Sequence, residues 1–103
     1  MPIVILITTK NVSEANRIAS ALVEDRLIAC ANIIKGVQSL FRWQGKVDRA
    51  SETLLILKSE KKNFSKVVGA VKKLHSYEVP EIIALPIIDG NKDYLKWIKK
   101  SCS

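Results

Sequence analysis

The sequence predicts an α+β fold in which one antiparallel four-stranded sheet carries helices on one face. Three observations support this prediction. Strand-like and helix-like segments follow one another in the order β-α-β-β-α-β, with one more helix at the end, which is the split βαβ arrangement. The two middle strands are long and are joined by a short turn, so they form a hairpin. The chain has 103 residues, the size of a single domain covering residues 1–103.

The first strand and the first helix are predicted within the opening part of the chain. Residues 2–9 form a continuous, mainly β-branched run that is apolar on both sides, which is typical of an interior strand. Asn11 then stands where it can cap a helix, and Glu14, three residues later, can complete a capping box. Apolar residues recur at helical spacing from there, which predicts an amphipathic helix over residues 12–25.

A long β-hairpin follows this helix. Its first limb covers residues 27–43 and is rich in apolar residues, with Gly36 as a bulge or bend inside it. Gln44 and Gly45 form the turn, and the return limb covers residues 46–58.

The last part of the chain predicts two helices with a strand between them. Asn63 is placed to cap a helix over residues 64–74, and Asn91 to cap a further helix near the C-terminus. The strand between them covers residues 82–88 and contains Pro86. Because proline cannot donate a hydrogen bond to a sheet, we expect this strand at an edge or at a bulge.

The hairpin is too long to be covered by its own domain. About 13 extended residues reach roughly 43 Å, whereas a compact domain of about 100 residues is only about 34 Å across. The overhanging end carries Leu40, Phe41 and Trp43, each of which costs on the order of 2 kcal/mol to leave in water. We therefore expect a closed oligomer in which the hairpins pair with neighbouring copies. In the alternative, Gly36 breaks the limb and the tip folds back on its own domain.

The basic charge favours no nucleic-acid function. Lys and Arg number 17 and Asp and Glu number 10, which gives a net charge of +7. The excess lies mainly on helices of the second half, where lysines on an outer face keep a protein soluble. Nucleic-acid partners are not expected, because the lysines are not interleaved with aromatic residues and the strands are aliphatic, whereas RNA-binding sheets carry aromatic residues that stack on bases.

Composition predicts a cytoplasmic protein with no membrane partner. The longest apolar run, Ile3 to Ile7, is far shorter than the ~20 residues of a membrane-spanning helix. The N-terminal segment lacks the charged start and cleavage site of a secretory signal. Cys30 and Cys102 are too few and too far apart for a disulfide framework or a zinc site. Cys102 lies next to the C-terminus, where we expect it to be frayed and without a role.

Motifs spread over the whole chain resemble the CutA family of divalent-cation tolerance proteins. The resemblance is carried in order by Leu27-Ile28-Ala29-Cys30-Ala31-Asn32-Ile33-Ile34, Ser39, Trp43, Gly45-Lys46, Glu52, Lys58, His75-Ser76-Tyr77-Glu78-Val79-Pro80-Glu81-Ile82, Tyr94-Leu95 and Trp97-Ile98. It implies a ferredoxin-like sandwich with an extra C-terminal helix and a long hairpin, assembled as a homotrimer. It also implies a cytoplasmic role in tolerance of copper and other divalent metal ions.

The same resemblance implies a metal site that this chain retains only in part. Family members that bind copper use a cysteine in the first strand and two adjacent histidines; the corresponding positions here are Ile7, Leu74 and His75. His75 is the one candidate ligand left from that set, and Cys30, Glu78 or Glu81 are candidate co-ligands. In the alternative, His75 ends the second helix and bonds to a backbone carbonyl, and Cys30 packs as a small apolar residue.

An inter-subunit pocket is the second candidate site. Trp43, Glu52, Lys58 and Tyr77 belong to the matching motifs and lie near strand ends or next to the Pro80 turn. As a cleft for a small anion or a metal ion, it would use Lys58 and Tyr77 as donors and the carboxylates as acceptors. In the alternative, Glu52, Lys58, Tyr77 and Glu81 form a polar network that satisfies buried backbone groups at the trimer seam. Trp43 is then an anchor of the interface or the core. Many family members have proline at position 76, so Ser76 predicts a looser turn after His75.

No catalytic motif stands out, so we expect no enzymatic activity. The chain has no Gly-x-Ser-x-Gly, no phosphate-binding glycine loop and no His-Glu-x-x-His. The sequence therefore favours a trimeric metal-responsive binding protein with no obligatory cofactor. The alternative function is a small-ligand signalling trimer similar to the PII proteins, without a physiological metal.

Overall fold

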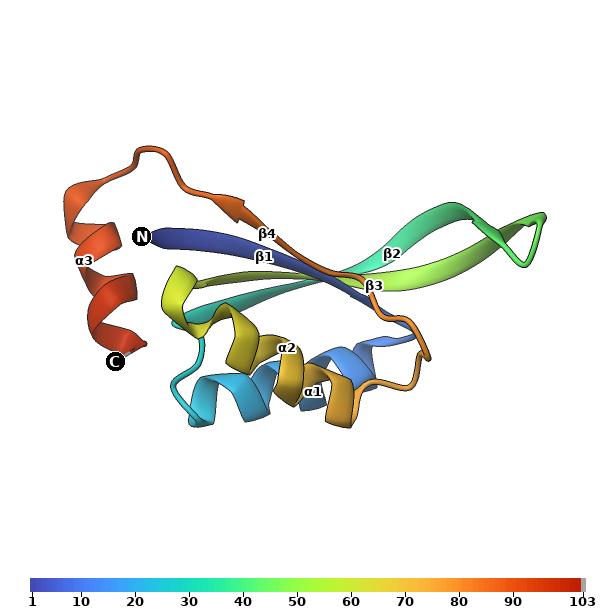
Figure 1. Cartoon of the computed structure of the whole chain (residues 1–103), viewed down its shortest axis with the longest axis horizontal. Coiled ribbons are helices and arrows are strands. Elements are labelled where there is room, and N and C mark those ends of the chain that lie inside the picture. The colour runs from blue at the N-terminus through green and yellow to red at the C-terminus, as the bar shows by residue number, and fades with distance from the viewer. Residues whose placement is uncertain (103) are drawn as a thin grey trace.

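The computed structural model describes residues 1–102 and shows one sheet, three helices and a projecting hairpin (Figure 1). The strands are β1 (Pro2–Thr9), β2 (Cys30–Trp43), β3 (Lys46–Glu60) and β4 (Ile82–Pro86), and the helices are α1 (Val12–Glu24), α2 (Phe64–Leu74) and α3 (Lys92–Ser101), with a single 3₁₀ turn at Lys61–Asn63. The predicted order of elements is therefore confirmed. Within residues 1–102, none of the helices has the length and apolar character needed to cross a bilayer.

The strand that comes earliest in the chain lies inside the sheet. The strand order is β2-β3-β1-β4, and every neighbouring pair is antiparallel. This order confirms β1 as an interior strand and β4 as an edge strand. β4 ends at Pro86, two residues before the predicted end, although the Ile87 N–H still donates a hydrogen bond of 3.1 Å to the Pro2 carbonyl.

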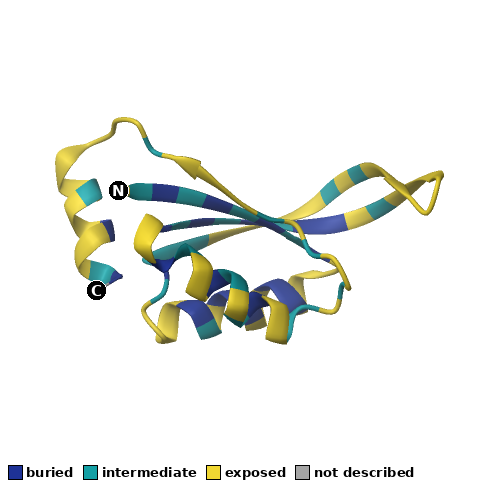
Figure 2. Ribbon diagram, viewed as in Figure 1, coloured by how far each residue is buried: buried dark blue, intermediate teal, exposed yellow. Residues whose placement is uncertain are grey.

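The hydrophobic core lies between the sheet and the helices α1 and α2. Alternate residues of β1 are buried, so Ile3, Ile5 and Ile7 point toward the helices while Val4 and Leu6 lie on the other face. Figure 2 shows the buried residues gathered on the strands and on the helix sides that face them. The remaining buried core residues are Ala15, Ile18, Ala19, Leu22, Ile28, Leu55, Leu57, Val67 and Val71.

The face of the sheet turned away from α1 and α2 is apolar and partly open to solvent. Its edge residues Ile34, Ile83 and Leu85 are 44, 48 and 50% exposed. Leu85 pairs with Val4 and Ile83 pairs with Leu6, so these apolar side chains adjoin one another on this face. We refer to this surface as the open face.

The β2–β3 hairpin extends beyond the body of the molecule, as the sequence predicts. The molecule measures 44 × 26 × 22 Å, and the hairpin forms one end of the long axis (Figure 1). Leu40 and Val47 are each 61% exposed near its tip, so the alternative in which the tip folds back is wrong. Gln44 and Gly45 both have positive φ, 50° and 79°, which matches the twist that a two-residue hairpin turn requires.

Gly36 lies at a bulge in β2, which confirms its predicted role. The pairing register shifts between Ile34 and Val37, and Gly36 has a φ of 79° in the left-handed region.

Replacing Gly36 with Ala should lower the free energy of unfolding by about 1 kcal/mol, because an L-residue is strained in this conformation. Among residues 1–102, and apart from the two neighbours of Gly36 in the chain, no atom lies within 4 Å of the added Cβ, so backbone strain sets this cost. A Cβ added at Gly69, in the middle of α2, also has open space around it, but the helical backbone there suits alanine. Gly69→Ala should therefore raise stability by about 0.5–1 kcal/mol. Urea denaturation of both variants checks the pair, and a loss of stability in both would contradict this explanation.

Two of the three predicted helix caps are confirmed. The Asn11 side chain accepts a hydrogen bond of 2.8 Å from the Glu14 N–H, and the Asn91 side chain accepts from Asp93 and Tyr94. The Glu14 carboxylate does not complete a capping box, since it bonds to Lys10 rather than to the Asn11 N–H.

The predicted cap at Asn63 is wrong. Asn63 lies in the 3₁₀ turn with helical backbone angles, and its side chain makes no cap hydrogen bond. Its amide nitrogen instead donates to the carbonyls of Cys102, at 3.1 Å, and Leu27. Cys102 is also not frayed as expected: it is 3% exposed at the end of α3, and burial raises the pKa of its thiol. Asn63 thus fastens the C-terminal helix to the body of the protein.

Candidate functional site

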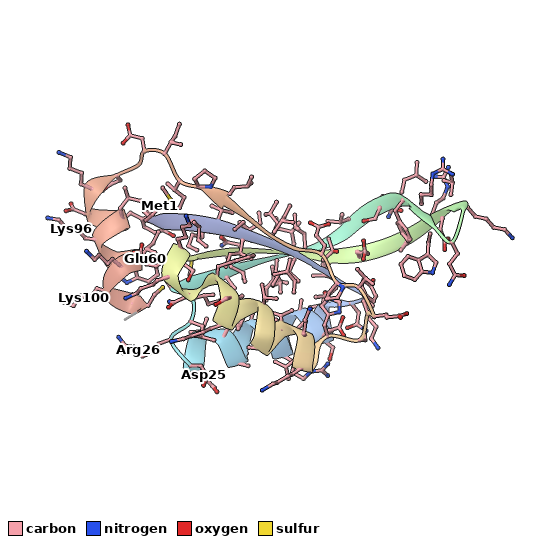
Figure 3. All side chains as sticks on the ribbon, viewed as in Figure 1. Met1, Asp25, Arg26, Glu60, Lys96 and Lys100 are labelled. Atoms are coloured by element: carbon pink, nitrogen blue, oxygen red, sulfur yellow. The ribbon has the colours of Figure 1, made fainter. Side chains whose placement is uncertain are left out.

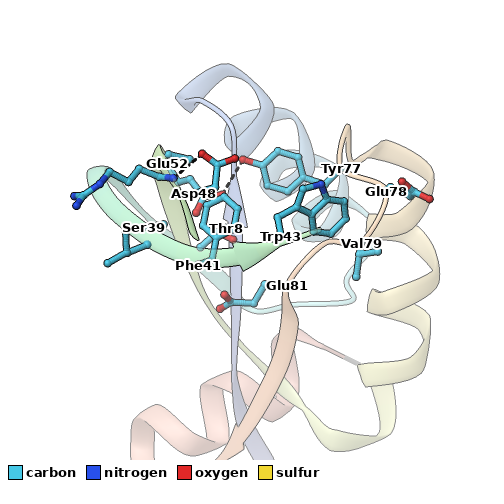
Figure 4. Close-up of a pocket in the computed structure, with 13 residues that line it drawn as sticks. Thr8, Ser39, Phe41, Trp43, Asp48, Glu52, Tyr77, Glu78, Val79 and Glu81 are labelled. Carbon is cyan, nitrogen blue, oxygen red and sulfur yellow. Dashed lines mark hydrogen bonds between the residues drawn. The ribbon is translucent and has the colours of Figure 1, made fainter. Parts of the chain in front are cut away.

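A cavity of about 680 Å³ lies where the hairpin leaves the sheet, and it is the main candidate site. Its lining comes from the end of β1 at Thr8, from both hairpin strands, which contribute Trp43 and Glu52, and from the loop between α2 and β4, which contributes Tyr77 and Glu81. Figure 4 shows these side chains around the cavity. The predicted pocket residues Trp43, Glu52 and Tyr77 are therefore brought together, although they are far apart in the sequence.

Tyr77 and Glu52 form the central polar contact of this cavity. The Tyr77 hydroxyl donates a 2.7 Å hydrogen bond to Oε2 of Glu52 (Figure 4). Burial, and then this hydrogen bond to the carboxylate, raise the pKa of Tyr77 well above its usual value. The contact joins the root of the hairpin to the α2–β4 loop.

The cavity is acidic although the chain as a whole is basic. Its lining includes one basic residue, Arg49, and the four acidic residues Asp48, Glu52, Glu78 and Glu81. The sequence predicts a cleft for a small anion or a metal ion, in which Lys58 and Tyr77 would be the donors for an anion. Lys58 is not part of the lining, and the Tyr77 hydroxyl is already bonded to Glu52, so of these two alternatives the lining suits the cation better.

Lys58 and Cys30 lie together at the opposite end of the sheet. They are directly paired across β2 and β3, and the Lys58 ammonium donates to the side-chain oxygen of Asn32. The Cys30 thiol is half-buried and lies 3.5 Å from the Tyr94 hydroxyl on α3. This hydrogen bond is the main cause, and burial a smaller one, of a pKa of Tyr94 above its usual value.

His75 is held by the backbone on both sides of its ring. It ends α2, as the structural interpretation of the sequence predicts, and its side chain is fully buried. Nε2 lies 2.8 Å from the Thr8 carbonyl oxygen, and Nδ1 accepts a hydrogen bond of 3.0 Å from the Tyr77 N–H. These partners define the neutral tautomer with its proton on Nε2. A metal ion bound at either nitrogen would have to break one of these hydrogen bonds.

Glu14 is a buried carboxylate that sequence reasoning placed only as a helix-capping residue. It is 1% exposed, and its two oxygens accept hydrogen bonds from the N–H groups of Lys10, at 3.2 Å, and Ser76, at 2.9 Å. Burial by itself would raise its pKa, but the hydrogen bonds from Ser76 and Lys10 outweigh burial and lower the pKa of Glu14 below its usual value.

The turn after His75 is fixed, not loose as the presence of Ser76 suggests. The Ser76 N–H donates to Glu14, and a proline at this position has no N–H to donate.

The four metal-ligand candidates, His75, Cys30, Glu78 and Glu81, do not come together within one chain. Glu78 and Glu81 line the cavity, and His75 bonds to Thr8, which also lines it. Cys30 begins β2 at the other end of the sheet, where it pairs with Lys58. In the part of the chain that the structure describes, residues 1–102, no group of three or more His, Cys, Asp or Glu side chains could hold a metal ion. Within one chain, these candidates are therefore not gathered into one group of ligands.

Comparison with known proteins gives consistent similarities along the whole chain. Residues 3–101 match the family described as CutA1 divalent ion tolerance protein. The chain is 49% identical over 98 residues to the divalent-cation tolerance protein CutA of Thermus thermophilus, covering 95% of both chains. It is 41% identical over 99 residues to the chloroplastic protein CutA 1 of rice, covering 96% of this chain and 56% of that protein.

Solved structures show the same fold. The Cut A1 divalent cation tolerance protein of Thermus thermophilus superposes with a TM-score of 0.98 at 48% identity, over 100% of both chains. The structure of the periplasmic divalent cation tolerance protein CutA of Archaeoglobus fulgidus gives a TM-score of 0.97 at 41% identity, also over 100% of both chains. The α+β architecture, with its four-stranded antiparallel sheet and three helices, is thus shared with these proteins.

Proposed function

Because the chain belongs to the CutA1 divalent ion tolerance protein family, we propose that it acts in tolerance of divalent metal ions. In this proposal the protein is a homotrimer, and it binds copper or a similar cation. Its ferredoxin-like subunit supplies the hairpins and open faces through which three copies assemble. We assign it no catalytic activity and a cytoplasmic location. The names of relatives place the rice protein in the chloroplast and the Archaeoglobus protein in the periplasm, so cell fractionation is the check on location.

The exposed hairpin carries the proposal of a trimer. Leu40, Phe41, Trp43 and Val47 are between 39 and 61% exposed in a single chain. The open face adds a second apolar surface next to the root of the hairpin. Cyclic association of three copies would bury both surfaces and leave no free apolar edge for further growth.

The proposed copper site draws its ligands from different copies. Cys30 is the candidate best suited to copper by its chemistry, because a thiolate is a soft ligand, and its thiol is only half-buried. Glu81 is exposed and supplies a carboxylate. His75 takes part only if copper displaces the Thr8 carbonyl or the Tyr77 N–H from its ring.

Copper binding should be measurable by isothermal titration calorimetry. We expect micromolar or tighter affinity for the unmodified protein, and weaker binding by Cys30→Ser and His75→Ala. Cys102→Ser is the matched control, because Cys102 is the other free thiol and lies outside the proposed site. Circular dichroism verifies that each variant is folded. No measurable copper binding by the unmodified protein would refute the metal proposal, and unchanged affinity in one variant would remove that residue from the site.

The cavity favours a second candidate function, a trimer that senses a small organic ligand. Its volume of about 680 Å³ is within the range of small-molecule sites. Metal tolerance predicts thermal stabilisation by metal ions alone, whereas ligand sensing predicts stabilisation by an organic compound in the presence of a chelator.

A further inference from the structure

A groove of about 500 Å³ lies between the helices α1 and α2, away from both the hairpin and the open face. Its floor is apolar, since Leu22 is buried and Ala70 and Leu74 are half-buried. Asp25, at the end of α1, forms part of one wall and points into solvent (Figure 3). The proposed trimer associates through the hairpin and the open face, so it leaves this groove accessible.

The α2 wall of the groove carries two lysines. Lys66 and Lys73 are exposed and seven residues apart on α2, so they lie on one side of the helix, roughly 10 Å apart along its axis. Among residues 1–102, no carboxylate forms an ion pair with either lysine. The segment 61–77 contains five lysines and no acidic residue, so nothing within it offsets their charge. This wall therefore complements a partner that has carboxylates at the same spacing.

Between the two lysines lies a glycine that the fold itself does not require. Gly69 is exposed in the middle of α2, where glycine destabilises a helix relative to alanine. Among residues 1–102, leaving out its chain neighbours and the backbone of its own helix, no atom lies within 4 Å of a Cβ built at Gly69. A residue without a side chain lets a second backbone approach closely. Gly69 thus opens the α2 wall to a ligand that has a backbone of its own.

A protein helix fits this lining better than a nucleic acid does. The apolar floor can bury the apolar side of an amphipathic helix, as in other helix-binding grooves. Nucleic-acid sites use arginine and aromatic residues, and the lining that the structure describes contains neither. Asp25 on the opposite wall would also repel a phosphate backbone, whereas a helix can place a basic residue there.

We propose that the α1–α2 groove binds an acidic amphipathic helix of a partner protein. Its carboxylates pair with Lys66 and Lys73, and its backbone crosses α2 at Gly69. The proposal goes beyond metal tolerance and does not rest on it, because neither the copper candidates nor the hairpin contributes a residue to this groove.

Fluorescence anisotropy with labelled model peptides tests the charge pairing. The probe is a helical peptide of about 16 residues, built from alanine, leucine and glutamine, with two glutamates seven residues apart. In the control peptide, of the same composition, the glutamates are nine residues apart and lie on opposite sides of the helix. We expect saturable binding of the probe and much weaker binding of the control peptide. No saturable binding of the probe, or equal binding of both peptides, would overturn the proposal.

Charge reversal in the protein identifies the surface that binds. Lys66→Glu combined with Lys73→Glu should weaken binding of the probe about tenfold or more, because like charges then face each other. Lys92→Glu combined with Lys99→Glu is the matched control, since it reverses two exposed lysines with the same spacing on α3. This control should keep its affinity, and equal weakening in both variants would overturn the proposal.

Two further measurements separate binding from folding. The variant reversed at Lys66 and Lys73 should bind a peptide in which both glutamates are lysines, and failure to do so would overturn the proposal. Gly69→Leu should weaken binding of the probe about tenfold by blocking the close approach, without lowering the melting temperature, because leucine favours a helix. Undiminished binding by Gly69→Leu would overturn the proposal, as would an RNA oligonucleotide that binds these lysines more tightly than the probe.

Discussion

If the protein is the trimer proposed above, replacing Leu40 and Val47 with Asp should separate it into single chains of 11.5 kDa. Both side chains are 61% exposed in one chain, and they lie on the same face of the hairpin because Leu40 pairs with Arg49 and Arg42 with Val47. Each lost apolar contact costs on the order of 2 kcal/mol, so the two changes should raise the dissociation constant by about a thousandfold or more. Light scattering coupled to size-exclusion chromatography measures the mass directly.

A second aspartate variant controls for the change in charge. Val12 is also a partly exposed apolar residue, at the first position of α1, where an acidic side chain is compatible with the helix dipole. Val12→Asp should keep the mass of three chains. A single-chain mass for the unmodified protein at dilute concentration would disprove the trimer, and an unchanged mass for the hairpin variant would place the interface elsewhere.

Replacing Glu14 with Ala should lower the free energy of unfolding by about 3 kcal/mol. The substitution removes the acceptor of two backbone N–H groups, those of Lys10 and Ser76, and leaves them unpaired beside a buried space. Because Glu14 joins the start of α1 to the loop after His75, its loss also frees that loop. Urea denaturation at a fixed protein concentration measures the effect. Glu24→Ala, at an exposed position on the same helix, should change stability by less than about 0.5 kcal/mol.

The effect of Glu14 should depend on pH in one direction. Its pKa in the folded protein lies below the usual value of 4.5, despite burial, because of its hydrogen bonds. The stability that it contributes is therefore fully present above the unfolded-state pKa and is lost as the pH falls through the lower, folded-state pKa. We expect the difference between the unmodified protein and Glu14→Ala to be constant near neutral pH and to shrink in acid. A difference that grows in acid would contradict an ionised Glu14.

The fold could be predicted from the sequence because each element has a local signal. These signals depend only on residues that are neighbours in the sequence: the continuous apolar run of β1, the alternating and helical periodicities, and the Gln44-Gly45 turn. The predicted helix cap at Asn63 is wrong because the contacts of its side chain are not local. Its amide bonds to Leu27 and Cys102, which only the tertiary structure brings near, and these contacts replace the local cap.

The candidate site could be predicted only in part, because strand register determines which residues meet. Trp43, Glu52 and Tyr77 do share a cavity, but Lys58, six residues along β3 from Glu52, pairs with Cys30 at the other end of the sheet. The roles of Glu14 and Ser76 had no signal in the sequence. Their hydrogen bond depends on the packing of the α2–β4 loop against the start of α1.

The position of β1 has a consequence for how the protein is synthesised. Of the four strands, β1 leaves the ribosome first, yet Ile3 pairs with Ser59 on one side and with Pro86 on the other. The nascent chain therefore carries an aliphatic strand with open hydrogen-bonding edges until β4 has emerged from the exit tunnel, and such long-range pairing is slow. A translation product that stops before Ile82 would keep one of these edges open permanently and would be a target for chaperones, proteases or aggregation.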